Sequence, residues 1–353
     1  MVRKSASTIK KNMKYILDQK RDTQLHNATG KAMTDVFAVM DRCGVKVVPG
    51  IPKNKSKLLR VLDYPILVAF CLFKVCRADS VIYVYKENAL KIRIVNALRK
   101  IRRYNTVCLI NDVNSVREGV TEKIDEEFEL IGGADTILAP NEGSIEYMRK
   151  RGMNNKMIPV KVWDYLMDES GEDVVKFNEK GVLHVAFAGN LGKSLFIREL
   201  GDKPIASDKV VYHLWGDIED EHIFDEFDNV IYEGSVSAQE LIGEIRKKCD
   251  VGLVWDGERA STIAGVYGEY LRINNSHKCG CYLAAGLPVI VWSKSGAAYF
   301  VRESGCGWCI DSLEAIERIA CNMDKNVFEA TKEVSAGVRE GRYLTEAVLS
   351  ITV

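Results

Sequence analysis

The sequence predicts an α/β fold made of two Rossmann-like, doubly wound domains that face each other across a cleft. Short apolar runs rich in β-branched residues alternate with helical patterns along the chain. The alternation is interrupted once, by the polar and acidic segment Asp168–Asp173, and 353 residues suit two domains of ordinary size. We therefore expect an N-terminal domain over residues 1–165 and a C-terminal domain over residues 166–325. A helical segment, 326–353, could return to pack on the first domain.

The first domain contains six apolar runs of strand length, and the helical patterns between them predict a parallel sheet. The predicted strands span residues 15–17, 45–48, 81–84, 107–110, 136–139 and 157–160. The predicted helices span residues 31–43, 57–77, 88–102, 121–131 and 142–151.

The second domain repeats this alternation. Its predicted strands span residues 183–188, 210–215, 230–232, 251–255, 288–291 and 308–310. Before the fifth strand, a helix beginning near His277 is expected to stop at Gly286, because glycine favours the end of a helix.

The net charge of zero conceals a strong asymmetry between the two halves. Residues 1–110 contain 23 Lys and Arg against 7 Asp and Glu, a net charge of +16, and the remainder carries −16. Cations are dense at Lys53–Arg60 and at Lys91–Arg103. The second cluster has two explanations that the sequence does not separate. It is either a solvated helix face or a surface that attracts an anionic membrane or a lipid-diphosphate acceptor. No aromatic interleaving or known motif favours nucleic acid.

Cysteine use and hydropathy predict the compartment. Ten cysteines without a signal peptide suggest a reducing environment rather than a disulfide framework. The longest apolar run, Pro65–Phe73, is far shorter than the ~20 residues that span a bilayer. We expect a cytoplasmic protein, peripheral at the inner face of the membrane if the basic half binds lipid. Apolar side chains exposed on helices would serve a homo-oligomer equally well.

The clearest candidate site is the helix that begins at Asn275-Ser276-His277-Lys278. Its N-terminus is expected at the carboxyl edge of the second sheet. Free backbone N–H groups and the helix dipole favour an anion there, and Lys278 adds a full charge. This pattern predicts a site for a nucleotide or sugar diphosphate.

A second strand-to-helix turn contains Gly189, Asn190 and Lys193. The sequence Gly192-Lys193-Ser194 mimics the end of a P-loop, but the first glycine of that motif would have to stand at Phe187. What remains is a glycine-lined turn that could approach a pyrophosphate, or a turn whose glycines are purely conformational.

Other polar and aromatic residues stand where predicted strands end. Trp215, Tyr232 and Trp255 could stack on a base, with Gly234 leaving room for it, although packing in the core explains them equally well. Asp256 and Glu269 could accept hydrogen bonds from ribose or sugar hydroxyls. For each carboxylate, the sequence favours this role no more than the absence of one.

In the first domain, Asp112 comes directly after a buried strand and would face the cleft. It is either the N-cap of the next segment or the general base that accepts a proton from an acceptor hydroxyl. Gly30 and Lys31, in a turn before a helix, and Arg117 are candidates for acceptor contacts.

Metal and redox sites are not predicted. Cys306-Gly-Trp-Cys309 matches a CxxC pattern but enters a strand instead of opening a helix, so both cysteines are expected to pack as small hydrophobes. His26, His184, His213 and His222 are scattered, without zinc-ligand spacing, and the chain contains no Asp-x-Asp motif.

Together these motifs resemble the bacterial β-1,6-galactofuranosyltransferases of O-antigen and capsule synthesis. They resemble, more distantly, the glucosyltransferases that extend glycans on streptococcal serine-rich adhesins. The resemblance covers most of the chain and is most specific at Gly252–Gly257, Gly268–Tyr270, Asn274–Lys278 and Leu283–Pro288.

This resemblance implies a GT-B fold, in which the N-terminal domain (1–165) binds the acceptor and the C-terminal domain (166–325) binds a UDP-sugar donor. It also implies transfer without a metal or other cofactor. It implies that Lys278 grips the diphosphate beside Asn275 and His277, that Lys193 assists, and that Tyr232 lies near the nucleotide. Two departures stand out: Asn111 precedes Asp112 where the family has histidine, and Ser276 replaces a proline. The first leaves Asp112 as the candidate base.

The expected function is transfer of a hexose from a UDP-sugar to a hydroxyl of a glycan or lipid-linked saccharide, with inversion of the anomeric centre. Galactofuranose is the first choice for this hexose, and glucose is the second. Two alternatives remain open on the sequence. One is a non-catalytic, UDP-sugar-binding subunit of a glycosylation complex, and the other is a nucleotide-sugar epimerase.

Overall fold

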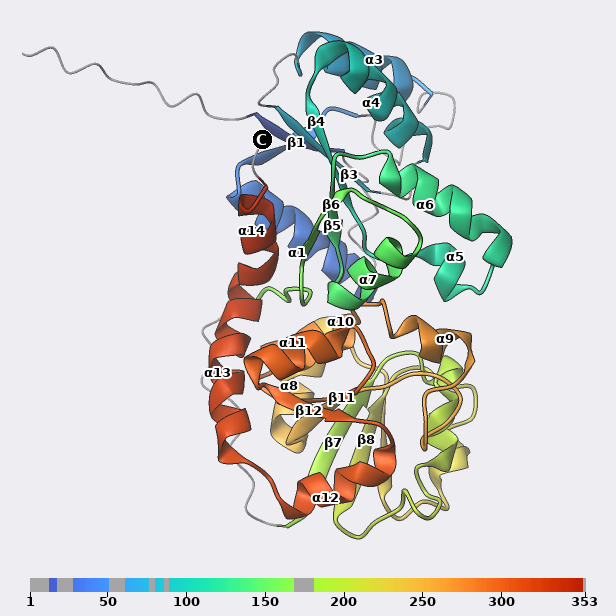
Figure 1. Ribbon diagram of the computed structural model, residues 1–353. Coiled ribbons are helices and arrows are strands. Elements are labelled where there is room, and N and C mark those ends of the chain that lie inside the picture. The colour runs from blue at the N-terminus through green and yellow to red at the C-terminus, as the bar shows by residue number, and fades with distance from the viewer. Residues whose placement is uncertain are drawn as a thin grey trace, which may run out of the picture.

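The computed structural model describes residues 13–17, 28–50, 61–75, 80–85, 89–167 and 181–351. These residues form two parallel six-stranded sheets, each covered by helices and lying one above the other in Figure 1. The cation cluster Lys53–Arg60 and the acidic segment Asp168–Asp173 fall outside the described residues, and the domain boundary at 165 stays a prediction.

The first sheet has the strand order β2-β1-β3-β4-β5-β6. Its strands are β1 Lys14–Leu17, β2 Val45–Val48, β3 Val81–Tyr85, β4 Asn105–Leu109, β5 Thr136–Ala139 and β6 Lys156–Pro159. Its helices are α1 Ala28–Arg42, α3 Asp63–Phe73, α4 Ala89–Arg102, α5 Asn114–Arg117, α6 Ile124–Gly132 and α7 Glu142–Lys150.

The second sheet has the order β12-β11-β10-β7-β8-β9. Its strands are β7 Leu183–Ala188, β8 Val210–Trp215, β9 Val230–Gly234, β10 Val251–Val254, β11 Val289–Trp292 and β12 Gly307–Ile310. The helices of this half of the chain are α8 Ala238–Lys248, α9 Gly265–Tyr270, α10 His277–Ala284, α11 Ala297–Ser304, α12 Ile316–Cys321, α13 Lys325–Glu340 and α14 Arg342–Leu349.

The strand predictions are confirmed to within about two residues at each end. The reason is that parallel strands covered on both faces are continuously apolar, as in Val81–Tyr85, where every residue is buried. The helix expected from residue 57 to 77 is described only as α3, which ends at Phe73. Cys306 and Cys309 pack at β12, as expected for small hydrophobes.

Helix α1 begins three residues earlier than predicted. Gly30 and Lys31 therefore lie in its first turn and not in a turn before it. The Gly30 carbonyl oxygen accepts a hydrogen bond from the Thr34 hydroxyl, as a helical residue does.

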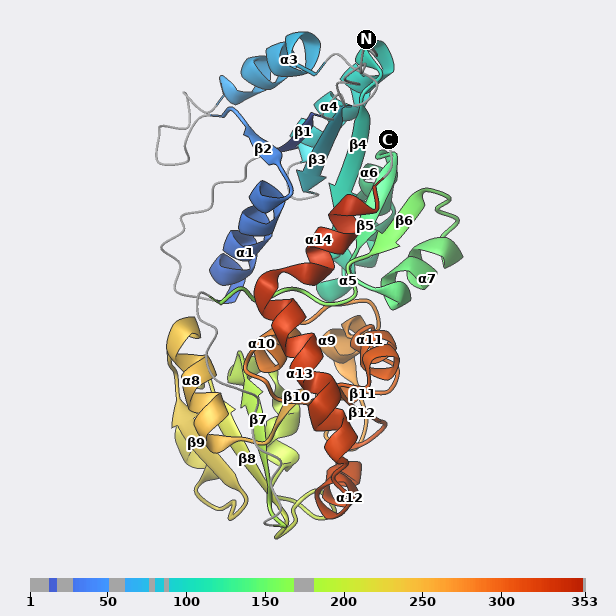
Figure 2. The same cartoon turned by 90° about the vertical axis from the view of Figure 1, so that its left-hand side faces the viewer.

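The C-terminal helices connect the two halves of the molecule. Helix α13 packs on α10 beside the second sheet, and α14 continues to the first sheet, where it packs against α1 (Figure 2). The buried carboxylate of Asp164 accepts hydrogen bonds from the backbone N–H groups of Tyr343 and Leu344 and so holds the start of α14. Within the described residues, no helix is both long and apolar enough to cross a bilayer.

A set of buried hydrogen bonds joins the carboxyl edges of the two sheets. Asn141, which caps α7, donates from its amide to the carbonyl oxygens of Ile273 and Asn274 at 3.3 and 2.9 Å. In return, the amide of Asn275 donates to the carbonyl oxygen of Pro140 at 3.0 Å. We call these four residues and Pro140 the interdomain latch.

Gly280 lets α10 approach the segment that comes after β6, because a Cβ at this position would overlap the carbonyl oxygen of Trp163. We predict that Gly280→Ala lowers the free energy of unfolding by about 1–3 kcal/mol through overpacking. The matched control is Gly243→Ala in α8, where nothing lies within 4 Å of an added Cβ and where alanine should stabilise the helix by about 0.5–1 kcal/mol. Urea unfolding of wild type and both variants measures these changes. A Gly280→Ala variant as stable as wild type would contradict the packing argument.

Candidate active site

Three glycines form a rim without side chains where β7, β8 and β9 end. The N–H of Gly189 donates to the carbonyl oxygen of Trp215 at 2.9 Å, and the N–H of Gly216 donates to that of Gly234 at 3.0 Å. A Cβ on Gly216 would overlap the Gly189 carbonyl oxygen, so the ends of β7 and β8 can approach this closely only with glycine at position 216. The rim leaves backbone accessible at the carboxyl edge, where α/β sheets bind ligands.

Lys278 lies over this rim at the N-terminus of α10. A Cβ on Gly189 would stand 2.8 Å from its Cε, and its ammonium lies 4.3 Å from the ring centre of Phe187. Burial lowers the pKa of Lys278, and Asp256 opposes this lowering only from 3.8 Å. The lysine is therefore a half-buried cation, with its side chain 17% exposed and an incomplete counterion beside open backbone, which favours a bound anion.

The predicted helix start at His277 is confirmed, and Ser276 is its cap. The Ser276 hydroxyl accepts a hydrogen bond from the N–H of Lys278. The turn at Asn190 differs from the prediction: it opens a 3₁₀ helix, Leu191–Lys193, whose Lys193 N–H donates to the Asn190 side chain. Asn190 is thus a helix cap, and the Lys193 ammonium lies 5.5 Å from the ring centre of Tyr267.

His277 occupies the boundary between the two domains. Its ring stacks on Trp163, with centroids 5.8 Å apart and planes inclined by 13°. Burial lowers its pKa to about 4; Asp112 acts in the opposite direction, and Lys31 adds to the lowering. His277 is consequently a neutral imidazole between the predicted donor and acceptor sides.

Asp112 is held by one residue from each domain. One oxygen accepts from Arg117 at 3.1 Å, and the other accepts from the Tyr270 hydroxyl at 3.0 Å. The Tyr270 oxygen also accepts from the N–H of Val113 at 2.8 Å, although Tyr270 belongs to α9. Asp112 makes no N-cap bond for α5, so the structure leaves its carboxylate fixed and about one third exposed at the cleft.

Lys31 and Asn275 take part in the domain contact. The Lys31 ammonium forms an ion pair with Asp35 and donates to the carbonyl oxygen of Leu166 at 2.8 Å. Asn275 is 2% exposed and belongs to the latch. Its Oδ1 is buried and has no hydrogen-bond partner among the described residues.

Two of the three aromatic candidates pack as core residues. Trp215 and Trp255 are 2% and 0% exposed, and the Trp255 indole donates to the carbonyl oxygen of Arg259. Tyr232 is half-buried and donates from its hydroxyl to the Gly216 carbonyl oxygen at 3.0 Å. Packing accounts for both tryptophans, whereas Tyr232 stands at the glycine rim.

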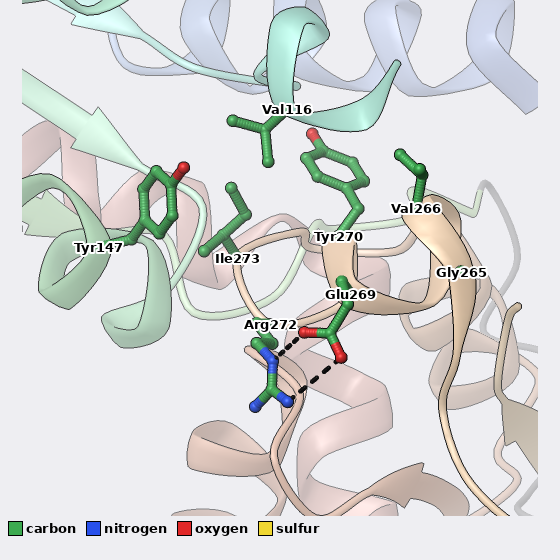
Figure 3. Close-up of a pocket in the computed structure, with 8 residues that line it drawn as sticks. All are labelled: Val116, Tyr147, Gly265, Val266, Glu269, Tyr270, Arg272 and Ile273. Atoms are coloured by element: carbon green, nitrogen blue, oxygen red, sulfur yellow. Dashed lines mark hydrogen bonds and ion pairs between the residues drawn. The ribbon is translucent and has the colours of Figure 1, made fainter. Parts of the chain in front are cut away.

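A pocket of about 520 Å³ opens beside Tyr270 at the domain boundary. Figure 3 shows Val116 and Tyr147 of the first half facing Val266, Tyr270 and Ile273 of the second. Glu269 lies at its edge and is paired with Arg272. The pocket has a mostly apolar lining and adjoins the residues that hold Asp112.

Sequence reasoning missed a buried polar chain on β7, β8 and β9. His184 and His213, treated as scattered, have ring nitrogens 2.9 Å apart, and His213 lies 2.8 Å from Glu233, which pairs with Lys248. Alternation along each strand gives the face on which each histidine lies, but only the register of β7 against β8 brings the two rings together. Among the described residues, no group of three His, Cys, Asp or Glu side chains could hold a metal ion.

Two family models match almost the whole described chain: the glucosyltransferase 3-like N-terminal domain at residues 13–162 and the C-terminal domain at residues 185–351. The chain belongs to the glucosyltransferase 3-like family. Family membership favours an enzyme that uses an acceptor over the binding subunit and the epimerase.

Individual relatives agree with this assignment. The chain is 28% identical to beta-1,6-galactofuranosyltransferase WbbI of Escherichia coli K12 over 263 residues, 72% of this chain and 73% of the relative. It is 26% identical to glucosyltransferase 3 of Streptococcus parasanguinis over 264 residues, 71% and 73% of the two chains. The predicted resemblance is confirmed, and the protein is a glycosyltransferase.

The fold matches HepE of Anabaena, solved in complex with UDP, with a TM-score of 0.56 and 14% identity over 96% of this chain and 98% of that chain. With its two facing parallel sheets, the molecule has the predicted GT-B fold.

The neutral state of His277 makes a testable contribution to stability. Its folded pKa of about 4 lies below the ordinary value of 6.5, so between these values the unfolded chain binds more protons. This contribution is fully favourable above pH 6.5 and is lost as pH falls towards 4, at most about 3 kcal/mol. We predict that His277→Gln loses less stability than wild type between pH 7 and pH 4 in urea titrations. Parallel curves would show that His277 does not titrate this way.

Proposed function

We propose that this glycosyltransferase moves a hexose from a UDP-sugar to a sugar hydroxyl of a glycan or lipid-linked acceptor in polysaccharide synthesis. The proposal rests first on Lys278, a half-buried cation with an incomplete counterion above a glycine rim. Galactofuranose is the proposed sugar because WbbI is named for it, and glucose is the second choice because glucosyltransferase 3 is named for that.

On the donor side, the diphosphate would lie between Lys278, the N-terminus of α10 and the rim at Gly189. The short helix alone would be a weak anion site; the lysine supplies the full charge. When the sugar leaves, negative charge grows on UDP, and a cation held in a desolvated position stabilises it more than one in water would. Lys193 would add a second, more exposed cation. No metal or other cofactor enters the proposal.

On the acceptor side, Asp112 would remove the proton from the attacking hydroxyl. The acceptor oxygen would form the bond to the anomeric carbon as the bond to UDP breaks, the proton would pass to Asp112, and UDP would depart. Direct attack of this kind inverts the anomeric centre. Arg117 and Tyr270 would orient the carboxylate, and the pocket beside Tyr270 would accommodate the acceptor.

The donor site is tested by Lys278→Met, which keeps the side-chain volume and removes the charge. Wild type should gain about 2.7 kcal/mol of stability from UDP at 100 times its dissociation constant. The variant should lose most of this gain and at least ~2 kcal/mol of transition-state stabilisation, about thirtyfold in kcat/KM. Thermal unfolding with UDP, GDP, ADP and NAD measures the first effect, and steady-state transfer measures the second.

The matched control is Lys294→Met, because Lys294 is exposed and stands outside the proposed site. It should keep both the UDP response and the turnover. Equal stabilisation of wild type and Lys278→Met by UDP would remove Lys278 from the donor site, and stabilisation by NAD alone would overturn the UDP-sugar proposal.

The base is tested by Asp112→Asn, which keeps the shape and loses the proton acceptor. Transfer should fall by about 10²–10⁴-fold while UDP stabilisation stays unchanged. Glu118→Gln is the control, because Glu118 is the other carboxylate paired with Arg117, and it should transfer normally. Retained transfer by Asp112→Asn would assign the base elsewhere, and an NMR spectrum showing a product with the donor's anomeric configuration would contradict inversion.

A further inference from the structure

Helix α3 is apolar on its exposed face as well as on its buried face. Leu67 and Cys71 point into the core, at 3% and 0% exposure. The opposite stripe has helical spacing and is also apolar: Leu62, Ile66, Ala69 and Phe73, with Phe73 75% exposed. Asp63 is the only charged residue in the helix. An all-round apolar surface helix marks a place where water is displaced by a partner.

Helix α4 extends this surface. It packs beside α3, and an ion pair of 3.3 Å between Lys91 and Asp63 aligns the first turns of both helices. Both helices connect parallel strands of one sheet and therefore run in the same direction. Phe73 stands ten residues after Asp63, and Ile101 stands ten residues after Lys91. Both side chains therefore lie near the C-terminal ends of the two helices. Ile101 is 69% exposed. Figures 1 and 2 show both helices at the end of the molecule remote from the second sheet.

Cations accompany this apolar surface. Helix α4 carries five Lys and Arg residues and no acid. Arg93 and Arg99 are engaged with Glu126 and Asp135. Lys74, Lys100 and Arg103 are exposed and form no ion pair with any residue in the part of the chain that the structure describes. The surface is therefore apolar and cationic at once.

We propose that this surface, the α3–α4 patch (Leu62, Ile66, Ala69, Phe73, Lys74, Lys100, Ile101 and Arg103), binds the surface of an anionic lipid bilayer. The apolar side chains would enter the headgroup region, and the cations would contact lipid phosphates. A second copy of the chain fits less well, because a two-fold contact would bring these cations against one another. The proposal does not depend on the sugar that is transferred.

The test is flotation of the full chain with vesicles of phosphatidylcholine alone or of phosphatidylcholine mixed with the anionic lipid phosphatidylglycerol. Wild type should bind the anionic vesicles and lose binding as salt rises. Ile66→Ser/Phe73→Ser should weaken binding at least tenfold by removing the apolar contact. Lys100→Gln/Arg103→Gln should weaken it about fivefold per charge and flatten the salt dependence.

The matched control is Leu349→Ser/Lys247→Gln, two exposed side chains away from the patch, at 62% and 73% exposure. It should bind like wild type, and all variants should keep the thermal unfolding and the soluble-acceptor transfer of wild type. Failure of transfer in every protein would reject the proposed function and leave the vesicle result standing. Absent binding of wild type, or equal binding of all variants, would overturn the patch. The proposal would also be overturned if wild type bound no lipid and formed a dimer that Phe73→Ser dissociates.

Discussion

The geometry of the candidate site depends on one buried amide, that of Asn141. Its side chain caps α7 through Ser144 and, with its amide, holds the carbonyl oxygens of Ile273 and Asn274 from the other half. A Cβ on Gly296 would overlap this amide, so a second element must stay small for the latch to form. Because the latched segment joins α9 to α10, it places Tyr270 beside Asp112 and Lys278 over the glycine rim. An unpaired buried amide costs about 1–3 kcal/mol. The contact therefore favours this one arrangement of the two halves as well as holding them together.

The two sides of the site have opposite electrostatic needs, and the fold separates them. Lys278 lies where burial lowers its pKa and Asp256 stands too far away to compensate fully, so a bound anion would relieve the desolvation. Asp112 has the reverse arrangement, since a guanidinium and a hydroxyl fix its carboxylate. Neutral His277, stacked on Trp163, lies between them without adding charge. The cation proposed for the leaving group and the carboxylate proposed for the nucleophile can thus coexist without forming a direct ion pair.

Local patterns in the sequence predicted the strands and the start of α10, because both depend on nearby residues: continuous apolar runs for one, a serine cap and a later glycine for the other. The roles of Asn275, Trp255 and Lys31 could not be read in this way. Each is decided by a backbone carbonyl far along the chain, that of Pro140 for Asn275 and that of Leu166 for Lys31, or by burial beneath other elements. The same limit hid the His184–His213 pair, which only the β7–β8 register brings together.

The direction of α3 links the lipid-binding proposal to the cleft. In a parallel α/β sheet the helices run opposite to the strands, so α3 begins at the carboxyl edge of the first sheet. A small pocket lined by Leu17, Val48 and Asp63 shows this directly, since two of these residues end strands and the third starts α3. The exposed stripe therefore begins with Leu62 near the carboxyl edge of the first sheet and ends with Phe73 away from that edge. Because α3 and α4 lie at the end of the molecule remote from the second sheet, a bilayer bound to the α3–α4 patch would leave the cleft uncovered.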